Sequence, residues 1–234
     1  MNPKLAGLCL TMGMSLAVQA DTFHFTPITD QGNPLLQSLG NQLTVDVTQG
    51  GADNVLMTFS NPGNINSTIA QVYLDDSPVD LFSSVAVASQ STGVSFSAGA
   101  NPGNLPGGNA PAFAFDATSS FGANPPAPTS GVNDSGRYPG EFLTLSATLN
   151  SGHTFADAIN SLSAGNASNG NFLRIGAHVI SIADLNDASA SFLDTGTGGG
   201  AAPPPPIPEP ETWGMLMAGL GFLTALARRR RKDG

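Results

Sequence analysis

The chain has 234 residues and a formal net charge of −9, and 40% of its residues are hydrophobic. This length is enough for one globular domain together with terminal signals. Most basic residues lie near the two ends, so residues 21–207 hold two basic against fourteen acidic residues, a net charge of −12. Such a region lacks the basic surface that binding to nucleic acid or anionic lipid requires.

The first 20 residues have the three parts of a secretory signal peptide. Lys4 supplies the positive charge, residues 5–18 are apolar, and small residues at positions 18 and 20 form a cleavage site. We therefore predict cleavage between Ala20 and Asp21, with an uncleaved anchor as the alternative. The only cysteine, Cys9, lies in this segment, so the processed chain can form no internal disulfide even in an oxidising compartment.

Residues 21–195 are predicted to form a mainly β domain, an antiparallel β-sandwich with one short helix. Apolar and polar residues alternate over residues 42–48 and 141–150, which is the pattern of strands with one buried face. Further strands are expected at residues 22–28, 54–60, 68–75, 79–89, 93–97, 171–182 and 189–193. Gly, Pro and Asn separate these short segments, as in sandwich folds.

The predicted helix begins after Thr154, which can cap it, and runs to about Leu162. Asp157 would lie at the positive end of the helix dipole. Residues 98–140 are rich in Gly, Pro, Asn and Ser, and we expect a long surface loop there, with short strand pieces near residues 113–115. Residues 196–207 contain a glycine run followed by four prolines, which predicts a stiff linker.

Residues 208–232 combine a proline-rich triplet, an apolar segment and a basic tail. The uncharged segment 213–227 would form a helix about 22 Å long, which is short against a hydrocarbon core of roughly 30 Å. The basic tail 228–232 would stay on the cytoplasmic side and place the preceding residues outside. The basic stop consists of Arg228, Arg229, Arg230 and Arg231.

This order of parts resembles the PEP-CTERM sorting signal of bacterial envelope proteins, a segment that is also labelled the ice-binding protein C-terminal domain. The resemblance implies that Pro208, Glu209 and Pro210 form the motif that exosortase, a membrane-embedded transpeptidase, recognises and near which it cuts. The alternative is a permanent tail anchor, in which the triplet merely ends the linker.

No residue pattern predicts catalysis or a bound cofactor. The three histidines lack metal-binding spacing, and no serine lies in a nucleophile elbow. Arg174 and His178 are expected together on the polar face of a strand. The only metal candidate is a cluster of Asp75, Asp76 and Asp80, which could bind Ca²⁺ weakly or form a solvated turn.

The resemblance to PEP-CTERM proteins implies an exported protein of structural or adhesive type, and we do not expect an enzyme. Its expected partners are the secretion translocon, exosortase and exopolysaccharide, with only transient attachment to the inner membrane and no nucleic acid. Its expected final location is the cell surface or the extracellular matrix. A carbohydrate-binding or Ca²⁺-dependent binding module is the alternative, and a secreted hydrolase is a weaker one.

Overall fold

Strands β1 to β10 form one antiparallel sheet in the part of the chain that the computed structural model describes, residues 20–133, 140–164 and 172–198. These residues lie in the first of two compact units, residues 1–199, and the second unit, residues 200–234, lies outside the described ranges. The strands are β1 (Ala20–Pro27), β2 (Thr44–Gly51), β3 (Asn54–Ser60), β4 (Thr68–Asp75), β5 (Phe82–Gln90), β6 (Phe96–Ala98), β7 (Ser119–Ala123), β8 (Leu143–Leu149), β9 (Arg174–Ile182) and β10 (Ala188–Gly198).

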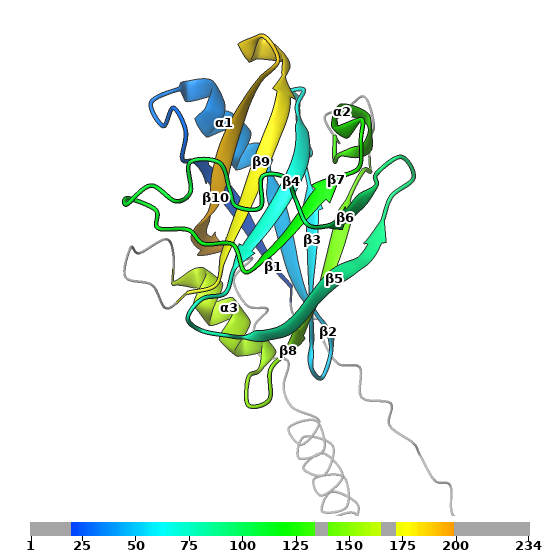
Figure 1. Ribbon diagram of the computed structural model, residues 1–234, viewed down its shortest axis with the longest axis vertical. Helices are drawn as coiled ribbons and strands as arrows, with labels where there is room; N and C mark the ends of the chain where they lie inside the picture. The colour runs from blue at the N-terminus through cyan, green and yellow to red at the C-terminus, as the bar shows by residue number, and fades with distance from the viewer. Residues whose placement is uncertain (1–19, 134–139, 165–171, 199–234) are drawn as a thin grey trace, which may run out of the picture. The chain divides into compact units, whose positions relative to one another are not determined.

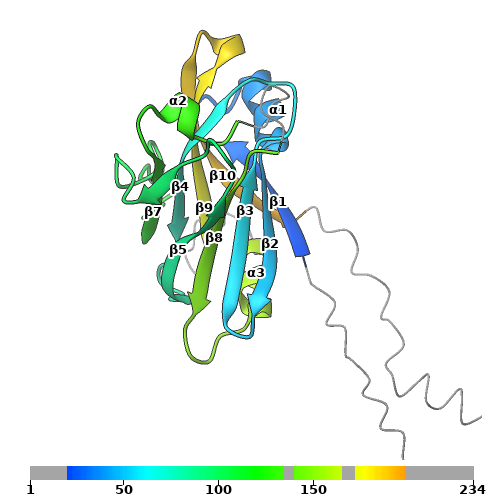
Figure 2. The same cartoon turned by 90° about the vertical axis from the view of Figure 1, so that its right-hand side faces the viewer.

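The sheet has the strand order β5-β8-β3-β2-β1-β10-β9-β4-β7-β6. It curls around one apolar core to which every strand contributes buried side chains. Alternation along β2 places its side chains, so that Val45 and Val47 are fully buried while Asp46 between them is partly exposed. Figures 1 and 2 show the curled sheet with helices α1 (Pro34–Gln42) and α3 (Phe155–Ser163) near its opposite ends.

The predicted mainly antiparallel β class is confirmed. The ten strands are joined by hydrogen bonds into one continuous sheet that folds over on itself, where two separate sheets were expected. Alternation identifies which face of a strand is buried, but it does not say which strands pair. The last strand, β10, runs to Gly198, so the predicted boundary between residues 195 and 196 falls inside a strand.

The helix predicted after Thr154 is confirmed as α3 (Phe155–Ser163). Thr154 and Asp157 form a capping box, in which the Thr154 hydroxyl accepts from the Asp157 N–H and the Asp157 carboxylate accepts from the Thr154 N–H. Its buried residues Phe155, Ala158 and Leu162 join the core.

The sequence analysis did not predict α1 (Pro34–Gln42), which packs against β1. Asn33 caps it by accepting from the Leu35 N–H at 3.0 Å. A side chain at Gly40 would lie only 2.4 Å from the Phe25 carbonyl oxygen, so glycine allows the helix to approach the strand closely.

Part of the predicted long loop is regular structure. β7 lies at Ser119–Ala123 and α2 (Ala127–Ser130) follows it. The strand pieces expected near residues 113–115 are not there, and that expectation is wrong. These residues turn because the Phe113 N–H donates to the Ala110 carbonyl at 2.9 Å, and their phenylalanines serve packing and not a sheet.

Candidate functional site

The segment between β6 and β7 covers the outer face of the sheet. It crosses β10, β9 and β4 in Figure 1. Leu105 and Phe115 from this segment are almost fully buried against Tyr73 on β4 and Leu193 on β10. These residues form a second, smaller core together with Ile28 and Ala100. The segment is therefore a packed layer of the fold.

Arg174 and Asp75 attach this layer to the sheet through a buried ion pair, Arg174 on β9 and Asp75 at the end of β4. The same guanidinium donates to the carbonyls of Phe113 and Ala114, and its centre lies 5.3 Å from the ring centroid of Phe115. The Asp75 carboxylate also accepts from the Asp116 N–H at 3.0 Å. Besides each other, Arg174 and Asp75 thus contact four groups of the covering segment.

A second polar group holds the covering segment farther along the same strands. The Gln71 side-chain oxygen on β4 lies 2.8 Å from His178 Nδ1 and 2.9 Å from the Tyr73 hydroxyl. The hydroxyl also lies 2.9 Å from the Pro102 carbonyl oxygen, and the Gln71 amide donates to the Asn101 carbonyl. Burial raises the pKa of Tyr73 to about 12 and lowers the pKa of His178 below its ordinary value.

The prediction that Arg174 and His178 lie together on the polar face of one strand is confirmed. The two residues share a face, as predicted, but the segment that follows β6 covers it. Asp75 and Asp76, expected in a solvated turn or a Ca²⁺ site, are likewise buried, with 1% and 6% of their surfaces exposed. Alternation assigns residues to a face, whereas a distant segment decides whether water reaches that face.

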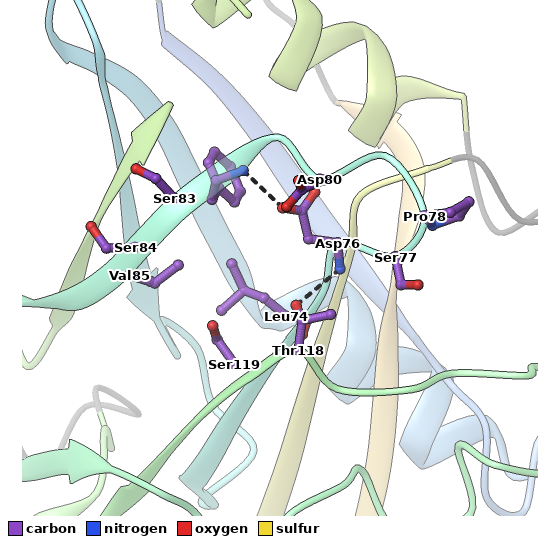
Figure 3. A pocket seen from close by; sticks show the side chains of 11 residues that line it. Leu74, Asp76, Ser77, Pro78, Asp80, Ser83, Ser84, Val85, Thr118 and Ser119 are labelled. Carbon is purple, nitrogen blue, oxygen red and sulfur yellow. Dashed lines mark hydrogen bonds between the residues drawn. The ribbon is translucent and has the colours of Figure 1, made fainter. Parts of the chain in front are cut away.

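A cleft of about 400 Å³ lies where the connection from β4 to β5 passes between the two ends of the sheet. Figure 3 shows its lining, which combines Asp76 with several hydroxyl side chains. The lining residues are Leu74, Asp76, Ser77, Pro78, Asp80, Phe82, Ser83, Ser84, Val85, Thr118 and Ser119. No basic side chain is among them, so the cleft favours neutral or cationic ligands over anions.

Asp76 shapes this cleft by closing the turn that precedes β5. Its carboxylate accepts from the backbone N–H groups of Leu81 at 3.0 Å and Phe82 at 2.8 Å. Burial raises the pKa of Asp76 above its ordinary value, and these two hydrogen bonds oppose the rise. The side-chain oxygens of Asp80, Ser84 and Ser119 have no hydrogen-bond partner among the described residues, and they are available to a ligand.

The three aspartates of the Ca²⁺ hypothesis do not converge on one point. Asp75 faces Arg174, while Asp76 and Asp80 line the cleft. Across residues 20–133, 140–164 and 172–198, no three His, Cys, Asp or Glu side chains lie close enough together to hold a metal ion. Ca²⁺ binding stays a prediction, and it would depend on the two cleft carboxylates with hydroxyl and backbone oxygens.

Asp194 on β10 is a buried carboxyl that the sequence analysis did not identify as unusual. It is 1% exposed, and it accepts from the Ile175 N–H at 2.8 Å. Burial raises the pKa of Asp194 to about 7, although this hydrogen bond and the nearby charge of Arg174 favour ionisation. The signal available in the sequence was only that an aspartate directly follows the apolar pair Phe192 and Leu193.

The residues predicted to direct sorting, Pro208, Glu209, Pro210 and Arg228 to Arg231, lie outside the described residues, as do residues 1–19. The helix predicted at residues 213–227 also lies there. Among the described helices, none is long and apolar enough to cross a membrane. Ala20 and Asp21, the predicted cleavage pair, begin β1.

Comparison with known families supplies the decisive observation. Residues 206–232 match the family model described as the PEP-CTERM protein-sorting motif. The chain carries a PEP-CTERM sorting motif. The match includes the Pro208-Glu209-Pro210 triplet, the apolar segment and the basic tail, and it says nothing of ice binding.

The PEP-CTERM motif marks the chain as an exported protein that exosortase sorts from a membrane-anchored precursor. The match covers 27 residues at the C-terminal end, so it concerns sorting and leaves the β domain to be interpreted from its own structure. No curated protein and no solved structure matches the chain.

Proposed function

We propose that the β domain is a structural or adhesive component of the cell surface or of the extracellular polysaccharide matrix, and that it is not an enzyme. The observation that carries the proposal is that ionisable side chains of the domain are engaged in fixed structural contacts. Asp75 and Arg174 hold the covering segment, and Asp76 closes a turn. Side chains with such fixed partners stabilise a rigid module and are poorly placed to transfer protons to a substrate.

The route to the surface follows from the terminal signals. The translocon exports the chain, and signal peptidase cuts between Ala20 and Asp21. The apolar segment 213–227 then holds the precursor in the inner membrane, with Arg228 to Arg231 on the cytoplasmic side. Exosortase recognises Pro208-Glu209-Pro210 and releases the domain to the cell surface or the exopolysaccharide matrix.

The test compares a strain that lacks the protein with strains that carry the wild type or the Glu209→Ala variant. We expect the wild-type protein to fractionate with matrix polysaccharide and to restore matrix cohesion in a shear assay. The variant should stay with the inner membrane. If the exported protein remains free in the medium and cohesion is unchanged, or if it depolymerises the polysaccharide, the structural role is refuted.

A carbohydrate-binding or Ca²⁺-dependent role is the second candidate, and the cleft between β4 and β5 supports it. Its free hydroxyl and carboxylate oxygens could accept and donate hydrogen bonds to a neutral sugar, and its volume suits a small ligand. Titration calorimetry with neutral disaccharides and with CaCl₂ tests this role. Heats that Asp80→Ala abolishes would support it, whereas identical heats for both proteins would refute it.

A further inference from the structure

One edge of the sheet is long and uncharged. Within residues 20–133, 140–164 and 172–198, β5 ends the strand order and pairs only with β8. The opposite edge strand, β6, has three residues, whereas β5 has nine. A free edge offers unpaired backbone groups to another strand. Natural proteins therefore usually protect long edges with proline or with charged side chains, especially lysine. β5 has the sequence FSSVAVASQ and contains none of these residues.

The middle of β5 is the part that another strand can reach. Ser84, Ala86 and Ala88 are exposed, and Val85 and Val87 are partly exposed. The register with β8 shifts before Ser84 and after Val87, so the strand is regular between these two residues. Open space adjoins its first half, because Ser83, Ser84 and Val85 line the cleft. Its last residue contacts β6, since the Gln90 side chain accepts from the Phe96 N–H at 2.9 Å.

We propose that β5 pairs with β5 of a second copy of this chain, antiparallel and with Ala86 on the two-fold axis. This inference rests on the proposed structural role and gives it a molecular contact. In this register Ala86 faces Ala86, and Val85 faces Val87 of the other copy. Val85 and Val87 thus form two symmetric cross-strand contacts of β-branched side chains, which stabilise antiparallel pairs.

The charge distribution allows two copies to meet at β5. Residues 21–207 carry a net charge of −12, so most faces of two copies repel each other. β5 has no charge of its own. The antiparallel register also places Asp80, which precedes β5, opposite Thr92, so the acidic groups of the two copies lie at opposite ends of the contact. An isologous contact of this kind closes with two copies and does not propagate.

The small number of regular residues makes the pair weak, so it should form at the high local concentration of a surface layer or matrix. Disulfide trapping suits such a contact, because Cys9 is the only cysteine and can be replaced by serine. In this background, Ala86→Cys places one thiol on the two-fold axis, where facing Cβ atoms are about 5 Å apart. Ala98→Cys is the matched control, since Ala98 is also an exposed alanine on an edge strand.

We expect the exported Ala86→Cys protein to form a disulfide-linked dimer on mild oxidation at least tenfold faster than Ala98→Cys. In sedimentation velocity, Ala86→Asp should raise the dimer dissociation constant at least tenfold over that of the wild type, because it places two like charges opposite each other. Ala98→Asp should not raise it. Equal cross-linking of the two cysteine variants, or a wild type that stays monomeric at millimolar concentration, would overturn the pairing. A monomeric protein that still fractionates with the matrix would overturn the pairing alone and leave the structural role intact.

Discussion

Arg174 on β9 and Asp75 on β4 lie on neighbouring strands and form an ion pair whose side chains are 8% and 1% exposed. Their backbones are register partners, so the sheet itself brings the two charges together. The guanidinium then extends to two carbonyls of the segment that covers the sheet. The pair therefore joins a segment of irregular structure to the most regular part of the molecule.

Removing one charge of this pair should destabilise the domain strongly. Asp75→Asn leaves the Arg174 guanidinium buried without a counter-ion, and we expect a loss of about 3–5 kcal/mol in the free energy of unfolding. Urea denaturation followed by circular dichroism measures this loss. Asp53→Asn is the control, because Asp53 is exposed and its replacement should change stability by less than about 0.5 kcal/mol. A similar small effect at Asp75 would contradict the role of the pair.

Asp194 should make stability fall as pH rises. The folded carboxyl keeps its proton to about pH 7, whereas the unfolded carboxyl loses it near 3.8. Between these two pH values the folded state binds more protons than the unfolded state. The stabilisation that Asp194 contributes is therefore complete below the lower pKa and is lost as pH rises through the higher one. From pH 5 to pH 8 we expect the wild type to lose roughly 3 kcal/mol through this group.

The Asp194→Asn variant separates this effect from the other ionisable groups. Asparagine can still accept from the Ile175 N–H but does not titrate. Urea denaturation at each pH gives the unfolding free energies of the variant and the wild type. As pH rises, the variant should therefore become more stable relative to the wild type. A difference that is constant from pH 5 to pH 8 would show that Asp194 titrates normally.

Gly40 offers a test of how α1 packs on β1. In an exposed helix, Gly→Ala stabilises by about 1 kcal/mol, but here a Cβ would lie 2.4 Å from the Phe25 carbonyl oxygen. We therefore expect Gly40→Ala to destabilise the domain by about 1–3 kcal/mol, as overpacking does. Thermal melting measures the effect. Gly32→Ala, where no atom lies within 4 Å of the new Cβ, should be tolerated, and equal melting temperatures for both variants would refute the close packing.

The sequence predicted the strands well because alternation is a local property. The strand at residues 54–60 was predicted with the bounds that β3 has, and the capping box at Thr154 and Asp157 was readable from two residues. Helix α1 was missed because nine residues with a proline and a glycine give a weak helical pattern.

The candidate site was predicted less well because it depends on contacts between distant residues. Arg174 donates to the Phe113 carbonyl, which is 61 residues away in the sequence, and to Asp75, which is 99 residues away. Composition identified residues 98–140 as poor in regular structure, but it does not say what such a segment covers. The sorting motif was recognisable because its three parts follow one another within residues 206–232.

The most direct test of the central claim, an exported domain released by exosortase, is the intact mass of the protein isolated from the surface of an exosortase-containing host. We expect a chain that begins at Asp21 and ends near Pro210, without residues 213–234. The Glu209→Ala variant should instead keep its C-terminal segment and remain in the inner membrane. Recovery of wild-type protein at the cell surface with Arg228 to Arg231 still attached would contradict release and would indicate a permanent tail anchor.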